Sequence, residues 1–128
     1  MVVMLGFALA AANVRPVSSD ELPLRITAKS ALAHPDTYDG KTVTIEGTFA
    51  IGPEMQEVFD SDAGYSARDS RECLSVALTT RLGRHVYTWS GKTVSIVGKF
   101  RSHICPQNHI CLGYCSEAGI EGISVERN

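Results

Sequence analysis

The amino-acid sequence predicts an all-β protein with one short N-terminal helix, folded as a small barrel of five strands. Two observations support this prediction. Residues 39–49 and 90–100 are near-copies of one another, identical at seven of eleven positions. In both copies apolar residues alternate with polar ones, which is the pattern of a strand with one buried face.

Each copy carries a glycine at a position where the alternation would place a packing side chain. These glycines are Gly47 and Gly98. A glycine there marks a bulge, a sharp coil or a close approach of two backbones. Strands of a small closed barrel need such points, because each strand must bend as the sheet curves round to close. Two copies are too few for a solenoid, so we interpret them as two strands under the same geometric demand.

The chain before the first copy predicts a short helix. Residues 27–34 have Thr27 as a candidate N-cap, and Pro35 is expected to stop the helix. Ile26 and Leu32 are then placed to close one end of the barrel.

The remaining strands are shorter and are separated by polar segments. They are predicted at residues 57–59, 73–79, 110–114 and 120–125. Residues 60–72 are polar and turn-rich, which predicts a surface loop. Residues 81–85 have room for one helical turn, and residues 103–109 are expected at a hairpin tip.

Three stretches of the chain form a recognisable layout. The first contains His34-Pro35, Tyr38-Asp39-Gly40-Lys41 and Gly47, the second is the strand at residues 90–100, and the third is residues 109–113 with Ser116. Over about 100 residues this layout resembles a group of small bacterial exported OB-fold-like proteins, many without an assigned activity. The resemblance implies a five-stranded Greek-key barrel whose first and fourth strands are neighbours. This chain departs from that group in two ways. Only about ten residues stand where a typical OB-fold has a longer helix between strands three and four, and the cysteines are not part of the pattern.

The first residues predict export. Residues 2–12 are an apolar run with small residues at Ala8, Ala10 and Ala12, the spacing of a signal-peptide cleavage site. The run is too short to cross a membrane as a helix. We therefore expect residues 1–19 to be a signal peptide or a disordered N-terminal segment and residues 20–128 to be one OB-like barrel domain. The mature protein is then periplasmic or secreted, with no membrane span.

The four cysteines are Cys73, Cys105, Cys111 and Cys115. An even number in a small exported protein predicts two disulfides, with three possible connectivities. We expect Cys105–Cys111 to close the hairpin tip and Cys73–Cys115 to tie the middle strand to the last segment.

The alternative for the same residues is a metal site. His103 and Cys105, then His109 and Cys111, form a repeated His-x-Cys pair, and Cys115 follows. Thiolate and imidazole together suit zinc or copper. The spacing does not match common Cys-x-x-Cys knuckles, and an oxidising compartment favours disulfides, so our first expectation is no metal and no other cofactor.

The sequence offers no motif for catalysis. It has no Gly-x-Ser-x-Gly elbow, no Cys-x-x-Cys redox pair and no phosphate-binding glycine loop. We therefore expect a non-enzymatic binding or interaction module rather than an enzyme. Its partner would be another envelope or secreted protein, reached through an exposed strand edge or the loop at residues 60–72.

The charge balance and the aromatic residues refine this expectation. Twelve basic against 14 acidic residues give a net charge of -2, which lacks the basic groove that nucleic acids need. Aromatic rings in or near loops could form a binding surface, with packing at a barrel end as the alternative role. The candidates are Phe59, Tyr65, Tyr87, Trp89 and Tyr114.

Overall fold

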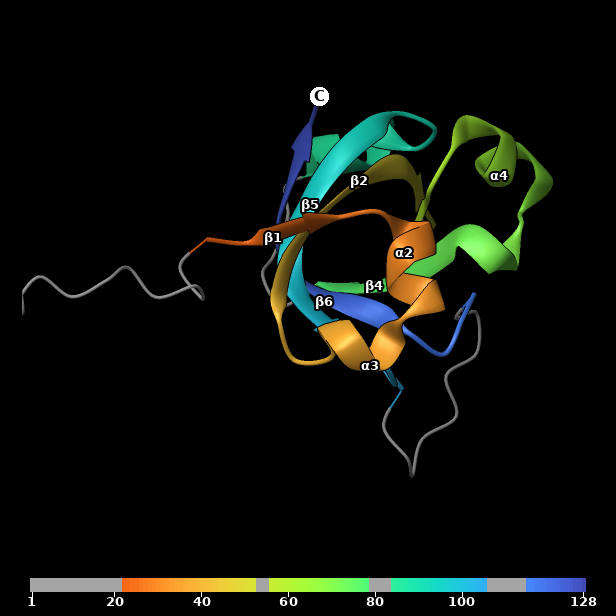
Figure 1. Ribbon diagram of the computed structural model, residues 1–128. Helices are drawn as coiled ribbons and strands as arrows, with labels where there is room; N and C mark the ends of the chain where they lie inside the picture. Colours follow the sequence, from red (N-terminus) through yellow and green to blue (C-terminus); the bar gives the residue numbers. More distant parts are fainter. Residues whose placement is uncertain (1–21, 53–55, 79–83, 106–114) are drawn as a thin grey trace, which may run out of the picture.

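The structure is a computed structural model that describes residues 22–52, 56–78, 84–105 and 115–128. This part of the chain is mostly β (Figure 1). Its strands are β1 (Leu24–Ile26), β2 (Thr42–Ile51), β3 (Gln56–Phe59), β4 (Cys73–Leu78), β5 (Thr93–Arg101) and β6 (Gly119–Arg127). Its helices are short: α2 (Ala28–Ala33), α3 (Pro35–Tyr38), α4 (Asp62–Ala67) and the 3₁₀ helices η2 (Ser70–Glu72) and η3 (Arg84–Trp89).

The strands close into a barrel. Their order is β2-β3-β4-β6-β5, and β5 returns to pair with β2, so five strands form a closed ring with β1 as an added edge strand on β2. Within the ring β4 and β6 run parallel and every other pair is antiparallel. The closed five-stranded barrel predicted from the sequence is confirmed, and its connectivity is OB-like.

The two sequence copies lie side by side as β2 and β5 (Figure 1). Their register sets Val43 opposite Gly98, Ile45 opposite Ile96 and Gly47 opposite Val94. The valine of each copy therefore lies opposite the glycine of the other copy, and the two isoleucines lie opposite one another. The copies are related by a local two-fold axis through the central isoleucine pair, and we call this pairing the seam.

The ends of the seam repeat the same symmetry. The Gly40 N–H donates to the Phe100 carbonyl at 2.8 Å, and the Gly91 N–H donates to the Phe49 carbonyl at 2.6 Å. Gly40 and Gly91 have φ values of 83° and 84°, a left-handed conformation that side chains with a Cβ rarely adopt. The same turn therefore begins each copy and ties it to the end of the other.

The glycines within the copies allow the barrel to close. A Cβ at Gly47 would lie 2.3 Å from the Phe59 carbonyl oxygen, and one at Gly98 would lie 2.1 Å from the Glu121 carbonyl oxygen. Each copy thus meets its second neighbour, β3 or β6, by a close approach of backbones, which is one of the three alternatives that the sequence left open. At Gly98 the pairing with β6 also shifts register, which leaves Ile123 as an extra residue.

The barrel interior holds the main core. Its largest fully buried side chains include Phe49, Phe100, Leu74, Ile45, Ile96 and Ile120. Helix α2 packs on this core through its small side chains Ala28 and Ala31, and Ile26 and Leu32 also pack against the core. The position between β4 and β5, where a typical OB-fold has a longer helix, holds η3.

Several elements differ from the sequence prediction. Pro35 ends α2 but also begins α3, because its missing N–H is not needed at the first helical position. The segment at residues 60–72, predicted as a loop, contains α4 and η2, because Ser61 and Asp69 cap them. Strand β1 was not predicted, and β6 is longer than predicted. The strand expected at residues 110–114 lies outside the described residues.

The predicted signal segment, residues 1–19, also lies outside the described residues. Within the described ranges, no helix has the length and apolarity needed to cross a bilayer.

Replacing Gly98 by alanine should destabilise the barrel by about 3 kcal/mol or more, because the new methyl group meets backbone atoms that cannot move aside. Urea unfolding measures this. The matched control is Gly40→Asn, at a turn with nothing within 4 Å. Asparagine tolerates the left-handed conformation, so the control should cost about 1 kcal/mol or less. Equal losses in both variants would contradict the close-approach argument.

Candidate functional site

A second, smaller apolar cluster lies on the outer face of the sheet. Side chains alternate between faces, so Phe59 and its cross-strand partner Cys73 point away from the main core. Both are buried, together with Ala50 of β2. Helix α4 covers them with Tyr65, whose ring meets the Phe59 ring edge-on at 5.9 Å. We call this group the outer cluster.

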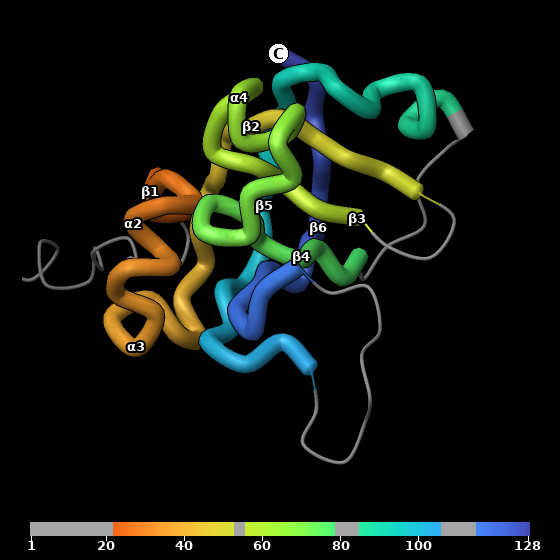
Figure 2. Tube along the Cα trace, turned by 90° about the vertical axis from the view of Figure 1, so that its right-hand side faces the viewer, coloured from red at the N-terminus to blue at the C-terminus, as the bar shows by residue number. Residues whose placement is uncertain are grey.

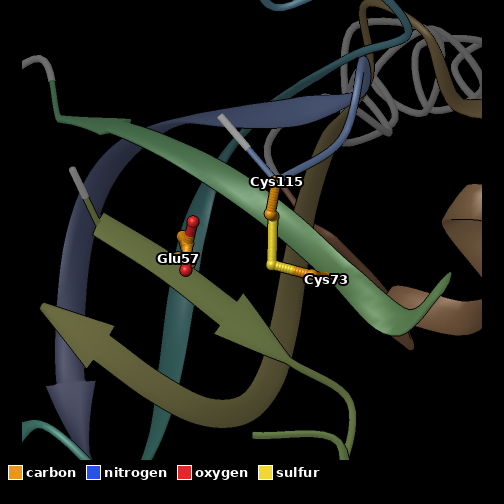
Figure 3. Close-up of side chains that lie close together, drawn as sticks. All are labelled: Glu57, Cys73 and Cys115. Carbon is orange, nitrogen blue, oxygen red and sulfur yellow. A yellow bond between two sulfur atoms is a disulfide. The ribbon is translucent and has the colours of Figure 1, made fainter. Parts of the chain in front are cut away.

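A disulfide joins Cys73 to Cys115 in the outer cluster (Figure 3). Its sulfurs are 2.10 Å apart and its Cα atoms 6.1 Å apart, so this half of the predicted pairing is confirmed. Cys73 is fully buried, whereas Cys115 keeps part of its surface exposed. The Cys115 N–H donates to Ser75 Oγ at 3.1 Å, which further fixes the segment entering β6 against β4. Cys105 is also disulfide-bonded, and Cys111 lies outside the described residues.

Glu57 lies beside this disulfide. A carboxylate oxygen of Glu57 and the sulfurs of Cys73 and Cys115 all lie within 4.8 Å of one another (Figure 3). Strand pairing produces this proximity, since Glu57 is opposite Ser75 of β4 and so shares the outer face. Partial burial raises the pKa of the Glu57 carboxyl, and the nearby Arg68 guanidinium opposes that rise.

Polar contacts within residues 60–72, and from this segment to β2 and α2, order the segment beside the barrel. Ser61 Oγ donates to Glu72 Oε1 at 2.6 Å, and the Glu72 side chain is almost fully buried. Thr48 Oγ1 of β2 donates to Asp62 Oδ1, also at 2.6 Å. Lys29 Nζ lies 3.9 Å from the second Glu72 oxygen. The segment is therefore an ordered platform rather than a loose loop, and we call it the 60–72 platform (Figure 2).

An open depression of about 370 Å³ lies near the turn that begins β2. Its lining residues are Asp39, Arg101, Ser102, His103, Ile104 and Glu121. The Ser102 N–H donates to Asp39 Oδ1 at 2.8 Å. This hydrogen bond is the main reason why the pKa of the Asp39 carboxyl is lowered. Arg101 and His103 each lie beside a glutamate, at 3.3 Å and 3.0 Å. Asp39, Arg101 and Glu121 thus already have polar partners within the protein.

The four candidate aromatic residues within the described ranges are divided between different parts of the fold. Phe59 is buried and Tyr65 packs on it, while Trp89 packs against the main core. Tyr87, on η3, is 58% exposed. Tyr114 lies outside the described residues. Three of the four described rings thus pack against other side chains, two of them in the outer cluster rather than at a barrel end.

The His-x-Cys residues are placed only in part. Cys105 and Cys115 are both in disulfides, so neither sulfur offers the thiolate that a metal needs. His103 Nδ1 lies 3.0 Å from Glu117 Oε2. His109 and Cys111 lie outside the described residues. The sequence by itself did not connect Glu57 with the cysteines. Only the register of β3 against β4 would have indicated that they lie close together.

The sequence matches no family model and no curated protein. The structure resembles a DUF3299 family protein from Pseudomonas aeruginosa, with a TM-score of 0.51 and 8% identity over 83% of this chain and 96% of that one. It also resembles a chain of the Stn1-Ten1 complex of S. pombe, with a TM-score of 0.46 and 11% identity over 88% of this chain and 81% of that one. At 8% identity the first likeness is one of fold alone, and it agrees with an OB-like barrel.

Removing the disulfide should cost about 3–4 kcal/mol of unfolding free energy, because its cysteines are 42 positions apart in the chain. The test is urea unfolding of a Cys73→Ala, Cys115→Ala variant against the oxidised protein. The main core contains neither cysteine, so the barrel should still fold and give a cooperative transition. A loss below about 1 kcal/mol would show that the crosslink contributes little beyond its packing.

Glu57→Gln should stabilise the protein at pH 7 but not at pH 4. The carboxyl has a folded-state pKa raised above its ordinary 4.5, so ionisation favours the unfolded chain. The wild type therefore loses stability, relative to the glutamine variant, as pH rises through the folded-state pKa. Unfolding free energies at the two pH values measure the effect. Glu126→Gln, at an exposed strand position, is the control and should show no such difference.

Proposed function

We propose that this protein is a non-enzymatic binding module on an OB-like barrel, and that it docks another envelope or secreted protein through the 60–72 platform. The observation that supports this most directly is that the partly buried Ser61–Glu72 and Thr48–Asp62 hydrogen bonds order the platform. A segment already ordered before binding loses less conformational entropy when a partner docks.

The exposed side of the platform suits a polar protein partner. Asp62, Ser66, Arg68 and Arg71 are all exposed there, so the surface offers both signs of charge. Rigid scaffolds commonly present binding residues on such connecting segments. Complementary charges would then set the partner's orientation and speed its encounter.

The disulfides support a location outside the cytoplasm. Cys73–Cys115 is formed, and Cys105 is also oxidised. Disulfides persist in oxidising compartments and are rare in the cytosol. This supports the proposal that the partner is itself an envelope or secreted protein.

Photo-crosslinking tests the platform. A crosslinking residue placed at Ser66 should capture one envelope or secreted protein, whereas the same residue at Lys99, exposed on β5, should not. The purified partner should then bind an Arg68→Glu variant several-fold more weakly and with altered salt dependence, as expected for an exposed charge. Identical capture from both positions, or unchanged affinity of the Arg68 variant, would refute a platform-mediated contact.

A further inference from the structure

We propose that the Cys73–Cys115 disulfide is a closed form of a metal site, and that the reduced protein binds one zinc ion through Cys73, Cys115 and Glu57. This site is distinct from the His-x-Cys set. It shares only Cys115 with that set, and its other two ligands, Glu57 and Cys73, lie on the outer face of β3 and β4.

The donor atoms suit zinc in kind and in spacing. Two thiolates and a carboxylate are common zinc ligands, and a tetrahedral site with Zn–S bonds of about 2.3 Å keeps its sulfurs about 3.7 Å apart. All three donor atoms already lie within 4.8 Å of one another. Once reduction breaks the bond, the two sulfurs are free to take up the tetrahedral spacing.

The surroundings favour a bound cation at this point. Ser75 is fully buried, and its Oγ lies 3.7 Å from Cys115 Sγ, so its hydroxyl can donate to the thiolate and orient it. Phe59 and Tyr65 shield one side of the cysteines from water. Glu57 and Cys115 both keep part of their surface exposed, which leaves a way in for the ion. A fourth position on the metal remains for water.

The chemistry balances with a dithiol as the reductant. The disulfide takes two electrons and two protons and becomes two thiols, while the dithiol becomes a disulfide. Each thiol then releases its proton to solvent as its sulfur binds zinc. The main core contains neither cysteine, so the barrel that carries the three ligands should persist through this change.

Cobalt titration of the reduced protein tests the site. A Cys105→Ser, Cys111→Ser variant leaves only the proposed pair of cysteines. After reduction by a phosphine without oxygen, it should bind one cobalt per chain with thiolate-to-metal charge-transfer absorption, and zinc should displace the cobalt. The oxidised variant should bind none. Circular dichroism before the titration establishes that the reduced barrel is folded.

A matched pair of glutamate variants identifies the third ligand. Glu57→Gln should weaken zinc binding by about tenfold or more, since even the loss of an outer-shell partner weakens metal sites on that scale. Glu126→Gln should bind as the parent does. Both are also measured in a Cys105→Ala, Cys111→Ala chain, so the comparison stands even if the serine variant folds poorly, and the His-x-Cys set cannot supply thiolates in either background. Absence of stoichiometric metal, or equal affinities in the two glutamate variants, would overturn the proposal.

Discussion

The pairing of β2 with β5 is the interaction on which the rest of the structure depends. It closes the barrel, and it joins two stretches of chain that repeat one sequence around a local two-fold axis. Each strand meets its partner on one edge and turns at a glycine to reach a different neighbour on the other, β3 for Gly47 and β6 for Gly98. The main core fills the space that this closure encloses. The outer cluster and the 60–72 platform lie outside this ring, so their positions depend on the barrel that the β2–β5 pairing closes.

The outer cluster shows how a small barrel can bear structure on both faces of its sheet. The inner face of β3 and β4 belongs to the main core, while their outer face holds Phe59, Cys73 and the disulfide. The crosslink ties β4 to the segment entering β6, and these two strands are the parallel pair of the barrel. Parallel pairing is slightly less stable than antiparallel pairing. The covalent bond therefore reinforces the parallel pair of the ring.

Local pattern explains which parts of this fold could be predicted from sequence. The alternation in residues 39–49 and 90–100 and the glycines within them are local signals. They were enough to predict the two strands and to mark the points where each strand departs from regular packing. The Cys73–Cys115 pairing was one of three possible connectivities, preferred because it ties the middle strand to the last segment. By contrast, the proximity of Glu57 to the sulfurs depends on the β3–β4 register, and the Thr48–Asp62 bond joins different elements. Contacts of this kind have no local signature, so the platform was predicted as a loop and the carboxylate was not connected to the cysteines.

The seam also has a consequence for how the chain folds. Thr48 and Thr93, at one end of the seam, are forty-five positions apart, so a long loop must close before the first of these hydrogen bonds forms. Barrels built on such distant pairings fold slowly compared with helical proteins of the same size. The Cys73–Cys115 crosslink does not help, because the route through it between the two threonines is no shorter than the direct one. Oxidation therefore stabilises the folded barrel without shortening the loop that must close before β2 and β5 pair.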